Sequence, residues 1–245
     1  MTAVEKKELA CFLDLVNDAI RGGYGRTEHE YDFSDDAQPE TAAAAHPPGW
    51  TDTLEAIANE VNACTACPLY KTRIKAVPGE GAAQPEVLVI GDGPDAEEDA
   101  AGKPFAGAAE ERLRKMLAPI GLAPETNCFL TGVVKCRPPE KREPLPDETI
   151  ACAAFLHRQI ALLKPRIILC TGRIAAHSLM RTTSDIDKLR GMETKIRIGN
   201  TIIPVIVTYH PNEIWKNEEL KRPAWEDLKR LKTLLDVRST GSTEE

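Results

Sequence analysis

The sequence has no long apolar run and few aromatic residues, and both scarcities limit what the protein can be. No stretch approaches eighteen consecutive apolar residues, so we expect no transmembrane helix. The first ten residues hold no apolar segment behind a basic start, so we expect no secretory signal, no membrane partner and a cytoplasmic location. In that reducing compartment the seven cysteines are expected to be thiols or metal ligands before disulfides.

Positive charge is scarce at the front of the chain. The net charge is −7, and residues 1–60 hold four Lys or Arg against thirteen Asp or Glu. The acidic excess therefore belongs to this front segment, and residues 61–245 have a net charge of +2. This near-neutral second part is compatible with a local basic face that binds nucleic acid.

The apolar pattern divides the chain into four segments. Residues 1–23 are predicted to form an amphipathic helix, which Gly22 and Gly23 end. Residues 24–52 are acidic and then rich in Ala and Pro, which is typical of a linker. Residues 53–237 are predicted to form the domain, and residues 238–245 a polar tail.

Within the domain, short apolar runs alternate with helical patterns. The runs predict strands at Val87–Ile90, Phe129–Val134, Ile167–Cys170 and Ile202–Thr208, and the patterns predict helices at Ala108–Ile120, Asp147–Leu163, Arg173–Met180 and Ala224–Leu235. Lys195–Gly199 with Asn200 is expected to form a small hairpin that leads into the last strand. The predicted fold class is therefore α/β, with three layers: a mostly parallel four-stranded sheet with helices on both faces.

Ligands of such sheets bind beyond the carboxyl ends of the strands, and one of these ends has an acidic loop. Gly91-Asp92-Gly93-Pro94-Asp95-Ala96 fits a dinucleotide-binding pattern, but Pro94 offers no N–H and the acidic side chains would repel a phosphate. A carboxylate at Asp92 instead suits a task such as orienting water. Glu97 and Glu98 have a plainer alternative as caps of the next helix.

Four cysteines lie beside irregular backbone. Cys64 and Cys67 form a C-x-x-C before a proline, Cys136 follows the second predicted strand, and Cys152 lies early in a helix. Such a set suits either a zinc ion or an iron–sulfur cluster, and spacing alone does not choose between them. The alternative is that Cys136 and Cys152 are ordinary buried thiols. The other cysteines, at positions 11, 128 and 170, are assigned to packing.

Three further features follow the predicted strands. His210 ends the most apolar strand, and Phe105 is an aromatic residue in a Gly/Pro loop. This position favours a stacking surface, and the alternative is a ring that packs back into the core. Lys135 and Arg137 flank Cys136, with Lys141 and Arg142 nearby. The basic run is either a solvated loop or an edge that contacts phosphates.

Together these residues resemble the family 4 uracil-DNA glycosylases, the iron–sulfur branch of that superfamily, over about residues 54–236. The resemblance rests on the four cysteines, the loop Gly91–Asp99, Phe105 within Gly102–Gly107, Val133–Pro139 and Thr208–Pro211. It implies a [4Fe–4S] cluster on Cys64, Cys67, Cys136 and Cys152. It also implies a monomer that acts on DNA in base excision repair, at the nucleoid in a bacterium.

The resemblance assigns roles to individual residues. The target nucleotide flips into a pocket at the strand ends, where Phe105 stacks on the base, Asp92 holds the attacking water and His210 stabilises charge on the departing base. The implied substrate-binding residues are Gly91, Gly93, Asp95, Phe105 and Gly132, and the implied DNA contacts are Lys135, Arg137, Ile214, Trp215 and Lys216. Ile214 or Trp215 is the wedge that fills the vacated stack.

Two departures from the family pattern bear on the substrate. Gly132 stands where the family has the Asn that reads the uracil edge, and Asp95 stands where it has Gly. The chain is therefore expected to be a divergent glycosylase for uracil, hypoxanthine or xanthine. The alternatives are a DNA-binding or lesion-sensing protein with weak or no glycosylase activity, and a dinucleotide-binding oxidoreductase.

Overall fold

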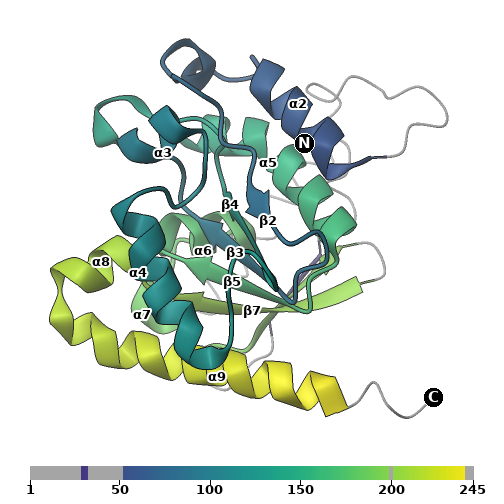
Figure 1. Cartoon of the computed structure of the whole chain (residues 1–245), viewed down its shortest axis with the longest axis vertical. Helices are drawn as coiled ribbons and strands as arrows, with labels where there is room; N and C mark the ends of the chain where they lie inside the picture. Colours follow the sequence, from purple (N-terminus) through teal and green to yellow (C-terminus); the bar gives the residue numbers. More distant parts are fainter. Residues whose placement is uncertain (1–28, 33–51, 199–200, 241–245) are drawn as a thin grey trace, which may run out of the picture.

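A mixed sheet forms the centre of the molecule (Figure 1). The computed structural model describes residues 29–32, 52–198 and 201–240. The strands are β1 (His29–Asp32), β2 (Glu80–Gly81), β3 (Val87–Gly91), β4 (Cys128–Gly132), β5 (Ile167–Thr171), β6 (Thr194–Ile198) and β7 (Thr201–Thr208). Their order across the sheet is β1-β6-β7-β5-β3-β4-β2. The predicted α/β class is confirmed, but within the described residues the sheet has seven strands and not the four that we expected.

The four predicted strands form the parallel centre of this sheet. β4 and β5 flank β3 and run parallel to it, and β7 runs parallel to β5. The three outer strands are short or polar: β2 and β6 are antiparallel to their neighbours β4 and β7, and β1 is parallel to β6. Of these three, the sequence indicated only β6, as an arm of the predicted hairpin. The predicted hairpin is confirmed by the pairing of β6 with β7, although residues 199–200 lie outside the described ranges.

Alternate residues of the strands pack into two separate hydrophobic cores, one on each face of the sheet. The sheet and the helices on its two faces form three layers. Leu88 and Ile90 pack on one face with α5 (Pro146–Leu163), α6 (Arg173–Met180) and α7 (Ile186–Leu189). Val87 and Val89 pack on the other face with α4 (Ala108–Leu117) and α9 (Lys221–Thr240), and Figure 1 shows one end of α4 reaching α9. Since side chains alternate across a strand, a fully apolar strand such as β3 must be covered on both faces.

The remaining helices lie at the strand ends or beside the sheet. They are α2 (Leu54–Ala63), α3 (Ala96–Ala101) and α8 (Pro211–Lys216), with 3₁₀ turns at Pro68–Lys71, Ala118–Ile120, Pro139–Lys141 and Glu218–Leu220. α2 contacts α5, to which Arg158 ties it through Glu60 and Asp52 at 2.5–2.9 Å. In the described ranges, none of the helices has both the length and the apolar character of a membrane span.

Two segment boundaries differ from those drawn from the sequence. β1 lies inside residues 24–52, so the predicted linker contributes an edge strand, and α9 continues to Thr240, inside the predicted tail. A four-residue strand with two acidic residues gives no period that a sequence pattern can reveal. The predicted helix of residues 1–23 lies outside the described residues, as does Cys11.

Candidate functional site

A pocket opens at the carboxyl ends of the neighbouring strands β3 and β4. Its lining includes Gly91 at the end of β3, Asp92 and Gly93 after it, Gly132 at the end of β4, Phe105, Glu98 and His210. The strand ends bring these residues together although they span more than a hundred positions of the sequence. Five of the predicted substrate or catalytic residues at strand ends therefore share one pocket with Phe105.

Asp92 turns its carboxylate toward the start of α6. Its Oδ1 accepts a hydrogen bond from Ala175 N at 2.8 Å. Gly172 makes this approach possible, because a Cβ at that position would lie 2.8 Å from both Asp92 oxygens, and its φ is +106°. Burial raises the pKa of the Asp92 carboxyl to about 7, although the Ala175 hydrogen bond opposes the rise. Sequence reasoning missed Gly172, whose only signal was a glycine between a strand and a helix.

His210 caps α8 and stays neutral near physiological pH. Its Nδ1 accepts from Asn212 N at 3.2 Å, and burial lowers the pKa of its imidazole to about 4. A neutral ring whose Nδ1 accepts carries its proton on Nε2. Its ring is also stacked beside Phe105, with the centroids 5.9 Å apart and the planes at 15°.

A polar network holds the strand end that carries His210. Arg190 lies over the ring of the neighbouring Tyr209, 4.2 Å from the centroid, and its Nη1 donates to the Tyr209 hydroxyl at 2.9 Å. The Arg190 Nε also donates to Asp227 Oδ2 on α9 at 2.7 Å. Tyr209, directly before His210, is therefore held by Arg190, which Asp227 holds in turn, and the sequence pattern singled out neither Arg190 nor Asp227.

Phe105 has a strained backbone that Glu98 supports. Its φ is +52°, which is costly for a residue with a side chain, and its N–H donates to Glu98 Oε1. The other Glu98 oxygen accepts from Asp95 N at 2.6 Å. Burial raises the pKa of the Glu98 carboxyl to about 7. The helix-cap alternative for Glu98 is thus correct, but the residue also lines the pocket and holds the aromatic residue in place.

Asp95 does not line the pocket as we expected. It is exposed, and its Oδ1 accepts from Glu97 N at 2.8 Å and Glu98 N at 3.0 Å, which makes it the N-cap of α3. Such a cap stabilises a helix by about 1 kcal/mol. The acidic residue at this position therefore has a local structural reason that is independent of the substrate.

Lys135 is not a DNA contact in this structure, which corrects the prediction. Its side chain is 1% exposed, and its Nζ donates to Thr131 Oγ1, Gly132 O and Gln159 Oε1 at 2.5–2.9 Å. Burial lowers the pKa of its ammonium to about 8. Arg137 is only partly buried, with Nη1 4.0 Å from the buried Asp99 Oδ2, so it remains a candidate contact.

The two predicted wedge residues, Ile214 and Trp215, point in different directions from α8. Ile214 is 8% exposed and packs with Tyr209 and Ala224, so it is not available to enter a base stack. Trp215 is 59% exposed, and the guanidinium of Arg112 lies 4.9 Å from its ring centroid. Lys216 is exposed beside it. The helix hides every third or fourth side chain, so only one of the two candidates faces outward.

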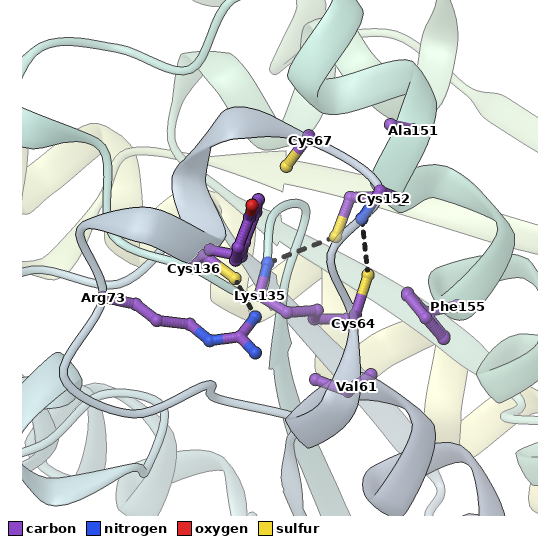
Figure 2. Close-up of a pocket in the computed structure, with 11 residues that line it drawn as sticks. Val61, Cys64, Cys67, Arg73, Lys135, Cys136, Ala151, Cys152 and Phe155 are labelled. Carbon is purple, nitrogen blue, oxygen red and sulfur yellow. Dashed lines mark hydrogen bonds between the residues drawn. The ribbon is translucent and has the colours of Figure 1, made fainter. Parts of the chain in front are cut away.

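Cys64, Cys67, Cys136 and Cys152 line a second pocket, and Figure 2 shows their sulfur atoms around one space. Cys64 ends α2, Cys67 precedes a 3₁₀ turn, Cys136 follows β4 and Cys152 lies on α5. Main-chain N–H groups of Ala66 and Lys135 donate to the Cys64 and Cys152 sulfurs at 3.5 and 3.3 Å.

Arg73 brings positive charge to this pocket. Its Nη1 donates to Cys136 Sγ at 3.0 Å (Figure 2), and its Nη2 donates to Asn62 O at 2.7 Å. Burial raises the pKa of the Cys67, Cys136 and Cys152 thiols, so metal binding would release their protons. Cys128 and Cys170 are fully buried in β4 and β5, as expected for packing.

The four cysteines fit a cluster by their donor chemistry. They line one shared pocket, and N–H groups donate to three of the four sulfurs, as such donors do in iron–sulfur sites. In the ranges that the structure describes, no three His, Cys, Asp or Glu side chains lie close enough to hold a single metal ion. The fit therefore rests on the shared pocket and its four thiols.

Comparison with known proteins identifies the family of this chain. The model of the family described as "Uracil DNA glycosylase superfamily" matches residues 78–229. The type-4 uracil-DNA glycosylase of Saccharolobus solfataricus is 39% identical over 75% of this chain and 87% of its own length. The proteins of the same name from Thermotoga maritima and Archaeoglobus fulgidus are 35% and 34% identical, over 75% and 74% of this chain and 95% and 92% of theirs. With its pocket at the strand ends and four cysteines beside it, this chain belongs to the type-4 branch of the uracil-DNA glycosylase superfamily.

Proposed function

We propose that the protein is a DNA glycosylase of base excision repair that hydrolyses the N-glycosidic bond of a flipped, deaminated base. The observation that carries this proposal is the shared pocket of Asp92, Phe105 and His210. It combines a carboxyl group, an aromatic ring and a neutral N–H donor, which are the groups that hydrolysis of a nucleoside requires.

Each of the three residues has a separate task in this reaction. The flipped base stacks on Phe105, which Glu98 holds in place. His210 donates from Nε2 to the oxygen where negative charge develops on the departing base, since its Nδ1 is engaged by Asn212 N. The Asp92 carboxylate orients the attacking water and stabilises the positive charge that develops on the sugar.

We propose uracil and a deaminated purine, hypoxanthine or xanthine, as the bases that the pocket accepts. Gly132 lines the pocket and offers only its main chain to a base. A side-chain amide would discriminate between bases far more strongly than shape alone, by factors of about 10⁴ in favourable cases. The lack of such a side chain favours a broader choice of base.

On the DNA side, we propose that Trp215 is the wedge, with Lys216 and Arg137 at the phosphates. Trp215 and Lys216 are exposed on the helix that His210 caps. The base pocket and the proposed wedge therefore lie at the two ends of one short helix, with His210 at its start and Trp215 in its last turn.

We propose that Cys64, Cys67, Cys136 and Cys152 hold a [4Fe–4S] cluster. When bound, such a cluster cross-links the chain segments that carry its ligands. Here those segments are the end of α2, the following 3₁₀ turn, the segment after β4 and α5. The segment with Cys136 begins at Gly132 in the base pocket, so the cluster would brace that wall.

Excision from a panel of DNA oligonucleotides tests the glycosylase function. Single-turnover assays would use uracil, hypoxanthine and xanthine, each in single strands and in duplexes. We expect release of at least one base, a loss of release in Asp92→Asn, and no change in Asp147→Asn, a control at an exposed position on α5. Lesion-dependent binding without any excision would contradict the proposal and support the DNA-binding alternative.

Metal analysis tests the cluster. The protein purified without oxygen should contain about four irons per chain and show the broad visible absorbance of a cubane cluster. Cys136→Ala should lose most of this iron. Cys170→Ala, which also removes a buried thiol, should retain it because Cys170 lies in β5. One zinc and no iron per chain would refute the assignment.

A further inference from the structure

Lys135 lies between the base pocket and the cysteine pocket. It lines the cysteine pocket, and its main-chain N–H donates to Cys152 Sγ at 3.3 Å (Figure 2). Its ammonium reaches the other way, to Thr131 Oγ1 at 2.5 Å and Gly132 O at 2.9 Å. Both of these residues line the base pocket. A single residue thus contacts a predicted cluster ligand and the wall on which the base rests.

The ammonium also organises a second layer behind that wall. Gln159 Oε1 accepts from Lys135 Nζ at 2.8 Å, and Gln159 Nε2 donates to Pro78 O at 2.6 Å. The main-chain oxygen of Lys135 accepts from Val77 N at 2.8 Å, and Val77 is a further residue of the pocket lining. Lys135 therefore holds two sides of the base pocket, one through its side chain and one through its backbone.

Stability alone does not account for this arrangement. The three acceptors of the ammonium are a hydroxyl, a main-chain carbonyl and an amide oxygen, all of which are neutral. Burial of a charge held by neutral groups costs free energy that an apolar side chain of similar length would not. Such costs are typical of functional sites, where a fixed geometry matters more than stability.

We propose that Lys135 is a positioning residue for base excision: its ammonium fixes the Thr131–Gly132 wall against which the flipped base is held. This inference rests on the proposed glycosylase function. Its reason is specific to this chain, because Gly132 has no side chain and the base meets only the main chain there. A main chain that selects a base must be held as firmly as a side chain would be.

Lys135→Met tests the proposal, since methionine has a similar length and no charge. We expect single-turnover excision to fall on the order of tenfold or more, because small misplacements of a bound group are costly. The differences between the excision rates of uracil, hypoxanthine and xanthine should become smaller. DNA affinity and iron content should stay within about twofold of the wild type. A purely structural role would not change the preference among bases.

Two further variants complete the test. Gln159→Met removes one of the three acceptors, so it should have the same effect on base preference but a smaller one on rate. Arg158→Met is the control at the neighbouring position of α5. The Arg158 guanidinium binds Asp52 and Glu60, so its loss should lower the melting temperature without changing base preference.

The outcomes separate this inference from the proposed function. Wild-type protein that excises no base would refute the glycosylase function. Wild-type activity with unchanged excision and preference in Lys135→Met would refute the positioning role. If Lys135→Met loses its iron or does not fold, Gln159→Met tests the positioning role instead. An unchanged base preference in Gln159→Met would refute that role.

Discussion

Asp92 and His210 face one pocket with their pKa values displaced in opposite directions. Burial disfavours the charged form of each, so it raises the pKa of the Asp92 carboxyl to about 7 and lowers that of the His210 imidazole to about 4. The same enclosure therefore keeps the histidine neutral as a hydrogen-bond donor and makes the charge of the aspartate depend on pH near neutrality.

This displacement predicts the pH profile of excision. Asp92 must be ionised to orient water, and a raised pKa means that it is protonated below about 7. The single-turnover rate should therefore rise with pH through about 7 and then level, while His210 stays neutral throughout. The residual rate of Asp92→Asn should lack this rise. The pKa of Glu98 is also raised to about 7, so Glu98→Gln is the control. The excision rate of this variant should still rise with pH through about 7.

Gly132 gives a second prediction at this scale. A Cβ there would lie 2.9 Å from Val134 O and 3.3 Å from Gly93 Cα, so an asparagine does not fit without a shift of the loop. Such overpacking costs about 1–3 kcal/mol. Gly132→Ala should therefore slow excision of every base, and it is the control for Gly132→Asn. Relative to Gly132→Ala, the asparagine variant should favour uracil over hypoxanthine. An equal ratio in the two would mean that an amide at this position does not read the base.

Lys135 shows where sequence reasoning failed for a single residue. A lysine within a basic run beside Cys136 suggests an exposed contact with DNA. Its burial depends on Thr131 and on Gln159, which is 24 positions away along the chain. Strand and helix periods do not reveal a polar partner on another element, so the sequence could not have predicted the inward direction.

At the scale of elements, the sequence predicted what is buried on two faces and missed what lies at the edges. β3 and β5 are apolar at nearly every position because helices cover both faces, and such runs are easily recognised. In β6, isoleucines alternate with Thr, Lys and Arg, and β2 is only two residues long, so neither strand has an apolar run. Asp92 and His210 were found for the same reason, because each follows a strand that the sequence marks clearly.

The pairing of α4 with α8 predicts how the wedge works. Arg112 on α4 lies over the Trp215 ring and donates to Asn212 Oδ1 at 2.6 Å, so it fixes both ends of the exposed face of α8. Trp215→Ala should weaken excision from duplex DNA, since stacking of an aromatic side chain on a base contributes about 1–3 kcal/mol. Arg112→Met should have a smaller effect in the same direction.

Single-stranded DNA is the internal control for both variants. No stack is vacated in a single strand, so excision from it should be nearly unchanged in Trp215→Ala and Arg112→Met. Equal losses on the two kinds of DNA would show that these residues support the pocket itself and not the opened duplex.

On the scale of the whole molecule, acidic charge is concentrated in one segment. Residues 28–50 hold six Asp or Glu and no Lys or Arg, whereas residues 1–27 hold four of each sign. β1 lies in the acidic segment and runs parallel to β6, so this charge begins at an edge of the sheet. Asp52, which precedes α2, and Glu60, within α2, are bound by Arg158 and contribute less to repulsion of DNA.

Two truncations separate the charge of the front segment from its other contributions. Removal of residues 1–27 leaves the net charge unchanged, so DNA affinity should stay the same. Removal of residues 1–50 takes away a net charge of −6 and also β1. It should therefore strengthen DNA binding, and it should lower the melting temperature because β6 loses one of its two neighbouring strands. The gain in affinity should be largest at low salt and shrink as salt screens the charge. Weaker binding by the longer truncation at every salt concentration would show instead that residues 28–50 contribute directly to the DNA complex.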